Sequence, residues 1–378
     1  MMKNSIGLYI HIPFCAGKCP YCDFYSVDFD EHLADRYTET LIGQIGVYSR
    51  GDYQSPAIIP AITPHISTIY FGGGTPSLMG AGRIARIMNV AHENFHVSNN
   101  AEITLELNPC TATPELMRGL AAAGINRLSV GMQSGADAEL RALGRRHTAG
   151  QTPAAADMAR RAGINNISLD WMLGIPGQTE HNLGETLRMI EECAPAHVSA
   201  YLLKIEPGTP FGKKVPKGVP GGDEAAGIYL AACAGLESLG MMQYEISNFA
   251  RRGYESRHNL NYWNCGEYLG LGPAAHSFIG GRRFFYPPSL DEFMSNPETV
   301  DDGEGGGEEE YAMLRLRLSA GLTEDGWRER YGGPIPDEYR SRAAGLAPHG
   351  LAEAGGGGVR LTRRGFLLSN EVITRIIG

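Results

Sequence analysis

Three cysteines close to the amino terminus have the spacing of a metal site. Cys15, Cys19 and Cys22 form C-x3-C-x2-C directly behind the apolar run GLYIHIPF. Thiolates at this spacing can converge on one soft metal centre while the loop wraps around it. On a [4Fe-4S] cluster, three ligands leave one iron atom open. A zinc site normally needs a fourth ligand, and His11 could supply it only by reaching around the loop from a strand.

Further polar residues follow apolar segments later in the chain. The glycine run 72–74 with Thr75 would let the backbone approach a ligand closely, although a glycine turn between a strand and a helix is common. Glu106, Gln133 and Asp170 each lie at or near the end of a β-rich segment, where they could also be satisfied structural groups. Their shared placement predicts a site on one face of the fold.

Two adjacent arginines are candidates for binding a carboxylate. Arg145 in LGRRH is the preferred one, because a guanidinium can hold a carboxylate through two hydrogen bonds. Arg146 is the alternative, with an ordinary surface role.

The elements that must position these residues alternate along the chain. Six segments are β-rich or alternate between apolar and polar residues: 8–12, 66–71, 102–107, 127–131, 167–173 and 197–203. Helical spacing of apolar residues lies between them at 33–41, 84–91, 116–120 and 183–190. This order predicts a parallel sheet with right-handed crossovers. Six units fall short of a closed barrel, so the predicted fold class is α/β, an open partial (β/α)6 barrel.

The rest of the chain divides by composition. Residues 206–222 are rich in Pro, Gly and Lys and predict a long loop, so the barrel is expected to occupy 1–222. A second region packed on the barrel is expected at 223–300. The run DDGEGGGEEE, 301–310, is interpreted as a linker to a small winged-helix-like domain that completes 301–378.

Composition limits the classes of function. The formal net charge is −9, and the arginines of the C-terminal domain alternate with acids, so no nucleic-acid partner is expected. The apolar start is too short for a signal peptide or a membrane span, and seven cysteines do not suggest a disulfide framework. The expected location is the cytoplasm, with peripheral binding at the inner face of the membrane as a further option.

A fourth motif, RHNLNYW at 257–263, is a candidate haem site. A neutral imidazole is a natural axial ligand of haem iron, and Tyr262 and Trp263 could pack against a porphyrin face. The same residues could equally form a packed turn around His258. His276 is a second candidate ligand. The remaining cysteines are scattered; Cys193 and Cys233 are expected to be small core residues, and Cys265 to lie near a bound haem only as a minor alternative.

The cysteine motif after a first strand resembles the signature of the radical S-adenosylmethionine (SAM) superfamily. The resemblance implies a [4Fe-4S] cluster held by Cys15, Cys19 and Cys22, whose open iron binds the amine and carboxylate of SAM. GGGTP matches the superfamily's GGTP motif, which contacts the SAM amino group. Resemblance to the coproporphyrinogen oxidase branch assigns these SAM contacts: Tyr9, Tyr21, Gly72, Gly73, Gly74, Thr75, Glu106, Gln133, Arg145 and Asp170.

Within that branch the chain resembles haem chaperones over essentially its full length. The resemblance rests on CPYCDF, YEISNFARRGYESRHNLNYW and GLGPAAHS, and it implies haem contacts at His258, Asn259, Tyr262 and Trp263. The oxidases carry a further cysteine where this chain has Phe24, a longer amino terminus, and an R-N-F-Q-G-Y-like sequence in place of RHNLNYW.

The resemblance therefore implies a cytoplasmic chaperone that hands haem to respiratory haem proteins, some of them membrane-bound. Radical chemistry, which would require an electron donor, stays open, and so does the question whether the chain is an enzyme. The alternatives are an oxygen-independent coproporphyrinogen III oxidase, which decarboxylates propionate side chains, and a radical SAM enzyme with an unrelated substrate.

Overall fold

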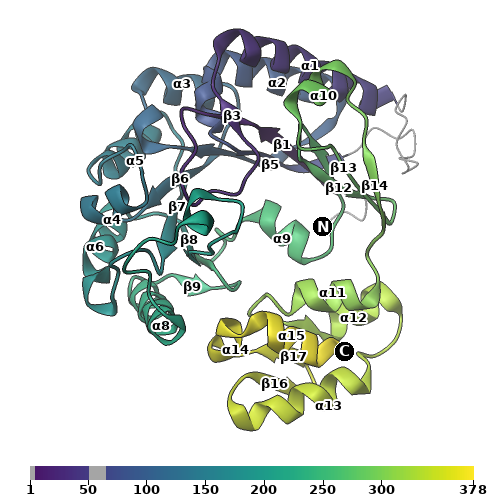
Figure 1. The fold of residues 1–378 in the computed structure, drawn as a ribbon. Helices are drawn as coiled ribbons and strands as arrows, with labels where there is room; N and C mark the ends of the chain where they lie inside the picture. The colour runs from purple at the N-terminus through teal and green to yellow at the C-terminus, as the bar shows by residue number, and fades with distance from the viewer. Residues whose placement is uncertain (1–4, 51–64) are drawn as a thin grey trace.

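The structure is a computed structural model that describes residues 5–50 and 65–378. Parallel strands form its centre and curve into an open, partial barrel (Figure 1). The six strands of the barrel are β1 (Ser5–Ile12), β4 (His65–Gly73), β5 (His96–Leu107), β6 (Arg127–Gln133), β7 (Asn166–Leu173) and β8 (His197–Leu202). Each coincides with a strand predicted from the sequence, so the predicted barrel is confirmed.

Helices between these strands cover the outer face of the sheet (Figure 1). They are α1 (Glu31–Arg50), α2 (Gly80–Asn94), α3 (Pro114–Ala122), α4 (Asp137–Ala142), α5 (Gln151–Arg161) and α6 (Gly184–Cys193). The apolar spacing predicted α1, α2, α3 and α6. It did not predict α5, because this helix buries mainly alanines, at 155, 156 and 159, instead of large aliphatic residues.

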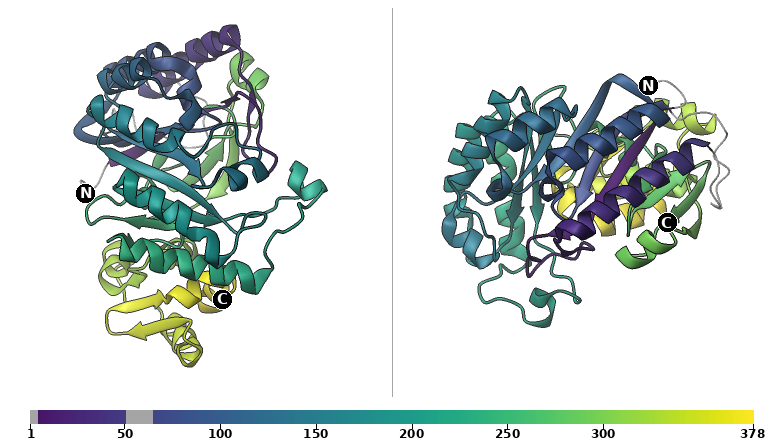
Figure 2. Two further views of the ribbon diagram at one scale, coloured as in Figure 1. Left: turned by 90° about the vertical axis from the view of Figure 1, so that its left-hand side faces the viewer. Right: turned by 90° about the horizontal axis from the view of Figure 1, so that it is seen from above.

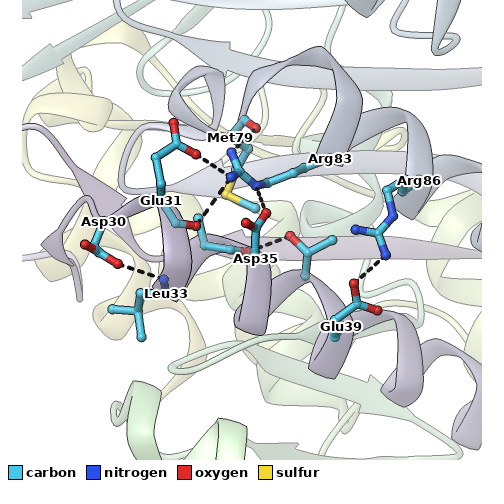
Figure 3. Close-up of polar contacts among 10 residues, drawn as sticks. Asp30, Glu31, Leu33, Asp35, Glu39, Met79, Arg83 and Arg86 are labelled. Carbon is cyan, nitrogen blue, oxygen red and sulfur yellow. Dashed lines mark hydrogen bonds and ion pairs between the residues drawn. The ribbon is translucent and has the colours of Figure 1, made fainter.

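Arginines of α2 hold α1 beside it on the outer surface (Figure 3). Arg83 donates to Asp35 at 2.7 Å and also pairs with Glu31, and Arg86 pairs with Glu39 at 2.5 Å. Such exposed ion pairs are worth about 0–1 kcal/mol each. The packing of buried apolar side chains beneath them is therefore what fixes α1 and α2 on the sheet.

Further strands extend the barrel sheet at both edges, the first beyond β1 parallel to it and all the others antiparallel to their neighbours. Beyond β1 come β11 (Tyr268–Leu271), β12 (His276–Ile279), β13 (Arg282–Phe285) and β14 (Val300–Glu304); beyond β8 come β10 (Asn248–Ala250) and β9 (Met242–Gln243). In the described part of the chain this makes one sheet of twelve strands, in the order β14-β13-β12-β11-β1-β4-β5-β6-β7-β8-β10-β9. The region after residue 222 thus continues the barrel's own sheet.

The acidic run 301–310 is not a linker, and that prediction was wrong. Its first half lies in β14, which pairs with β13 through Phe284 and Asp301, and its last three residues begin α11 (Glu308–Arg315). Backbone hydrogen bonds to β13 satisfy the strand, and Arg282 pairs with Asp301. Composition alone could not reveal this partner strand.

The remaining elements complete the two ends of the molecule. After the barrel come the short α7 (Pro210–Lys213), α8 (Gly222–Ser238), α9 (Arg257–Trp263) and α10 (Leu290–Ser295), and two short strands, β2 (Phe14–Cys15) and β3 (Val27–Asp28), pair beside the cysteine loop. The C-terminal elements are α11, β15 (Leu322–Thr323), α12 (Glu324–Tyr331), α13 (Asp337–Leu346), β16 (Ala352–Gly355), β17 (Gly358–Leu361), α14 (Arg363–Leu367) and α15 (Ser369–Ile377). They enclose a hydrophobic cluster around Trp327. The winged-helix assignment and the domain boundaries stay predictions.

None of the helices described in residues 5–50 and 65–378 combines the length and the apolar character needed to cross a bilayer.

Candidate functional site

The three cysteines lie on one loop that leaves the carboxyl end of β1. β2 and β3 pin the ends of this loop, with the Phe29 N–H donating to the Cys15 carbonyl at 2.9 Å. The Cys22 N–H donates to the Cys19 carbonyl at 3.1 Å, and all three thiols are half-buried. Burial raises the pKa of Cys22, and the neighbouring Cys19 and Cys15 raise it further.

His11 is not available as a fourth ligand. Its Nδ1 is hydrogen-bonded to the Tyr9 hydroxyl and its Nε2 to the Tyr25 carbonyl, both at 3.0 Å. Among the described residues no three His, Cys, Asp or Glu side chains converge on a point that could hold a single metal ion. A cubane cluster does not need such convergence, because each thiolate binds a different iron atom. The donor set therefore fits the cluster better than zinc.

Both candidate arginines reach the cysteine loop from the segment after α4. The Arg145 guanidinium donates to the Cys19 sulfur at 3.7 Å and to the Gly131 carbonyl at 3.0 Å. Its Nε is buried and has no hydrogen-bond partner within the described chain, which leaves a donor for a bound carboxylate. Arg146 donates to the Ala16 carbonyl at 2.6 Å, so it holds the loop backbone.

The glycine run at the end of β4 packs against the cysteine loop. The Gly74 N–H donates to the Ile12 carbonyl and the Thr75 N–H to the Phe14 carbonyl, each at 2.7 Å. Gly73 has φ +111°, and a Cβ on it would lie 2.6 Å from the His11 ring. These contacts require glycine and place the Thr75 hydroxyl 3.7 Å from the Cys15 sulfur.

Two carboxyl groups face the barrel interior below the cysteine loop. Glu106 accepts from the Tyr70 hydroxyl at 2.9 Å and from the Gly73 N–H at 3.1 Å. Burial, with the Asp170 charge adding to it, raises the pKa of Glu106 to about 7. Asp170 accepts from the Ser129 hydroxyl at 2.9 Å, and burial raises its pKa to about 6. Both carboxyls are thus poised between charged and neutral near physiological pH.

The remaining predicted SAM contacts surround these carboxyls. Gln133 has φ +62°, an uncommon conformation for a non-glycine residue, and its amide oxygen accepts from the Tyr201 hydroxyl at 2.9 Å. The Tyr9 ring stacks on Tyr70 at 6.2 Å between centroids. Tyr21 lies beside Cys19 and Arg145, and burial raises its pKa. Tyr9 lies in the middle of β1, with its ring 6.4 Å from that of His258, and the others lie in the carboxyl-terminal part of the barrel or on the loops above it.

The predicted haem residues lie towards the amino-terminal end of the barrel, and the His258 ring stacks on Tyr70, the partner of Glu106, at 5.2 Å between ring centroids. α9 packs at the amino-terminal ends of β1 and β4, where the His258 ring contacts Gly7 and the His258 N–H donates to Glu102 at 3.1 Å. The His258 Nδ1 is hydrogen-bonded to the Thr68 hydroxyl and Nε2 to the Tyr262 hydroxyl, each at 2.7 Å. Burial lowers the pKa of His258 to about 3. An iron atom could reach this neutral imidazole only by displacing a hydroxyl.

The end of α9 joins the barrel to the C-terminal elements. The Arg317 guanidinium lies 4.6 Å above the Trp263 ring and pairs with buried Glu245 at 3.0 Å. Asn259, earlier in the helix, is half-buried. The motif therefore connects two parts of the fold, whatever ligand it binds.

His276 differs from His258 in being exposed. It begins β12, its ring stacks on Phe285 at 5.0 Å, and none of the hydrogen bonds between described residues uses its ring nitrogens.

Cys193 and Cys233 are buried, as expected for core residues. Cys265 is buried in the C-terminal cluster beside Arg330.

Sequence reasoning missed the polar interior of the barrel. Arg127 is buried, lies 3.5 Å from the Thr104 hydroxyl, and its charge lowers the pKa values of both Glu106 and His258. His197 is buried between Ser168 and Tyr244. The strands of a parallel sheet are usually apolar along their whole length. Polar residues at every second position of these strands were therefore the signal that could have predicted a polar interior.

Comparisons with known proteins agree with this geometry. Residues 9–190 match the family model of the radical SAM superfamily. The chain is 34% identical to the Heme chaperone HemW of Mycobacterium tuberculosis over 394 aligned positions, covering 100% of this chain and 96% of the relative. Identity to the Heme chaperone HemW of Bacillus subtilis is 33%, with 100% of both chains covered. The chain belongs to the HemW family of radical SAM proteins.

Membership of the superfamily brings a [4Fe-4S] cluster and SAM as cofactors. The solved structure of coproporphyrinogen III oxidase (HemN) from Escherichia coli, described as a radical SAM enzyme, is similar with a TM-score of 0.84. It covers 99% of this chain and 90% of that protein at 23% sequence identity. This likeness shows a shared fold and does not carry an activity across.

Proposed function

We propose that this protein is a haem chaperone, which binds haem and passes it to haem-requiring proteins. The observation that carries the proposal is similarity above 30% identity to proteins named Heme chaperone HemW along the whole chain, including the segments beyond the barrel. Phe24, next but one to Cys22 and 68% exposed, supports it, because the oxidases have a further cysteine there.

We propose the following roles for the residues at the barrel mouth. Cys15, Cys19 and Cys22 hold the cluster, and the open iron leaves room for SAM. Glu106, Gln133, Arg145 and Asp170 bind SAM together with Tyr9, Tyr21 and the segment 72–75. When bound, the pair of cofactors supplies one-electron chemistry. The chain itself supplies a half-buried carboxyl group at Glu106 and a free guanidinium N–H at Arg145.

Two histidines compete as the iron ligand of haem. His258 belongs to the family motif but has both ring nitrogens bonded, whereas His276 is open. Tyr262→Phe removes one hydroxyl from His258 and leaves Nε2 without a partner. If His258 binds iron, this variant should bind haem more tightly than the wild type, and His258→Ala should bind it more weakly. If His276 is the ligand, only His276→Ala should change the Soret spectrum.

The function itself is tested on one anaerobically reconstituted sample. Iron and sulfide analysis comes first, then a haem titration followed by absorbance, then transfer of haem to an apo-haem protein. We expect near-stoichiometric haem binding and transfer. The same sample, given SAM, reductant and coproporphyrinogen III, should yield no protoporphyrinogen. Product formation without haem transfer would overturn the proposal in favour of the oxidase.

The acceptors we propose are respiratory haem proteins, including membrane-bound ones, with the chaperone acting from the cytoplasm at the inner face of the membrane. Co-sedimentation of the haem-loaded protein with membranes that contain such acceptors, and with membranes that lack them, tests this step.

A further inference from the structure

The lysines of this chain are few and gathered in two loops. Of 33 basic residues, only six are lysines: Lys3, Lys18, Lys204, Lys213, Lys214 and Lys217. Lys18 is in the cysteine loop, and four others lie between the end of β8 and the start of α8. Everywhere else in the described chain, positive charge is supplied by arginine, much of it paired with acids.

The segment after β8 reaches over to the cysteine loop. Residues 203–221 form an arm that projects from the body of the molecule and carries the short α7 (Figure 2). The Phe211 N–H donates to the Pro20 carbonyl at 2.9 Å, and the Phe211 ring lies 6.3 Å from the Tyr21 ring. Two residues of chain span at most about 7 Å, so Lys18 and Lys213 lie within about 20 Å of each other.

The charges of this arm have no partner among the described residues, with one exception. Lys204 pairs with Glu206 at 2.5 Å, whereas Lys213, Lys214 and Lys217 are exposed and take part in no ion pair of the described chain. Lys18 is exposed as well. The acids nearest in sequence are Asp23 beside Phe24, the already paired Glu206, and Asp223 and Glu224 at the start of α8, where Glu224 accepts from the Gly221 N–H.

Exposed apolar side chains accompany these cations. Phe24 is 68% exposed on the cysteine loop, and Val215 is 58% exposed between the lysines of the arm. An amphipathic ligand with a flat apolar body and two carboxylates matches such a surface, because its carboxylates would meet lysines and its body would cover the apolar side chains.

We infer that the arm and the cysteine loop form a docking surface for haem, in which Lys213, Lys214 and Lys217 with Lys18 hold the propionates and Phe24 and Val215 contact the porphyrin. The inference rests on the proposed function and adds a recognition site to it. It places recognition of the propionates at the cofactor end of the barrel and does not depend on which histidine binds the iron; both ring nitrogens of His258 are hydrogen-bonded, to Thr68 and Tyr262.

The decisive probe is haem whose two propionates are methyl esters. Wild-type protein should bind this ester about tenfold more weakly than haem, because each exposed ion pair contributes roughly a twofold to fivefold effect. The triple variant Lys213→Gln, Lys214→Gln, Lys217→Gln should bind haem about as weakly as the wild type binds the ester. The ester itself should bind both proteins equally. Raising the salt concentration should remove the difference between haem and ester.

A variant with the same net charge controls for general electrostatics. Arg118→Gln, Arg161→Gln and Arg375→Gln remove three exposed cations on α3, α5 and α15, away from the arm. This control should bind haem like the wild type.

Equal binding of haem and ester by the wild type would overturn the inference while leaving the chaperone function intact. A lysine variant that binds haem normally would also overturn the inference if its cluster is reduced slowly by an acidic protein donor but at the normal rate by dithionite. The lysines would then bind the electron donor and not haem. Absence of haem binding by the wild type would instead remove the proposed function.

Discussion

Replacing Glu106 by glutamine should separate the stability of the barrel from its affinity for SAM. Burial raises the pKa of this carboxyl from 4.5 to about 7, so the folded state favours the protonated form. The stabilisation from that preference is complete below the ordinary pKa and is lost as pH rises through 7. Glutamine cannot ionise, so Glu106→Gln should lack this loss.

The size of the effect follows from the pKa shift. At about 1.4 kcal/mol per pKa unit, a fully buried Glu106 would lose about 3 kcal/mol of stability between low pH and pH 8. Because Glu106 is only half-buried, we expect the wild type to lose about 2 kcal/mol more than the variant between pH 5 and pH 8. The hydrogen bonds from Tyr70 and Gly73 favour the charged form of Glu106 and are already included in its pKa of about 7, so they are not counted again.

Urea unfolding of the cofactor-free protein at pH 5 and pH 8 measures this difference. Glu191→Gln, an exposed position on α6, is the matched control and should keep the wild-type slope. The second arm is SAM binding by the reconstituted protein. An ionised carboxylate accepts hydrogen bonds more strongly than an amide, so Glu106→Gln should bind SAM about tenfold more weakly at pH 8. A variant with the wild-type pH slope, or with unchanged SAM affinity, would refute the reasoning.

Three further changes have defined outcomes. Gly73→Ala should lower stability in urea by about 2–4 kcal/mol, from strain and the clash with His11, whereas Gly80→Ala, also at a positive φ (+73°) but facing open space, should cost about 1 kcal/mol. Arg146→Ala should release the cysteine loop, so that a chelator strips iron several-fold faster than from Arg141→Ala. Trp263→Ala removes the half-buried ring beneath Arg317 and should lower stability in urea by about 1–2 kcal/mol, without changing the SAM affinity.

The strands and the mouth of the barrel were predictable because local pattern and motif agree there. The segment 66–71 is both β-rich and followed by the glycine run, and the structure continues it as β4 to Gly73. Helix α5 was not predicted because its buried face consists mainly of alanines, which give little periodic signal. Strand β14 was not predicted because its own residues are acidic and only the fold shows that it pairs with β13.

The candidate haem site shows a second limit of prediction from sequence, which concerns the tertiary partners of a motif. The sequence places His258, Tyr262 and Trp263 in one motif, but it cannot say what lies opposite them. In the fold, Thr68 comes from a strand 190 residues earlier and occupies one ring nitrogen of His258, while Tyr262 occupies the other. The accessibility of an imidazole depends on these tertiary partners, so only the structure distinguishes His258 from His276.

The acidic edge strand β14 bears on edge-to-edge association between copies of this protein. An unpaired edge of a large sheet is a template for pairing with another copy of the chain. Asp301, Asp302 and Glu304 are exposed along this edge, so two molecules approaching edge to edge would bring like charges together. The opposite edge, β9, is only two residues long. Neutralising the acids of β14 would therefore leave the folded core unchanged and remove the charge repulsion that opposes aggregation through this edge.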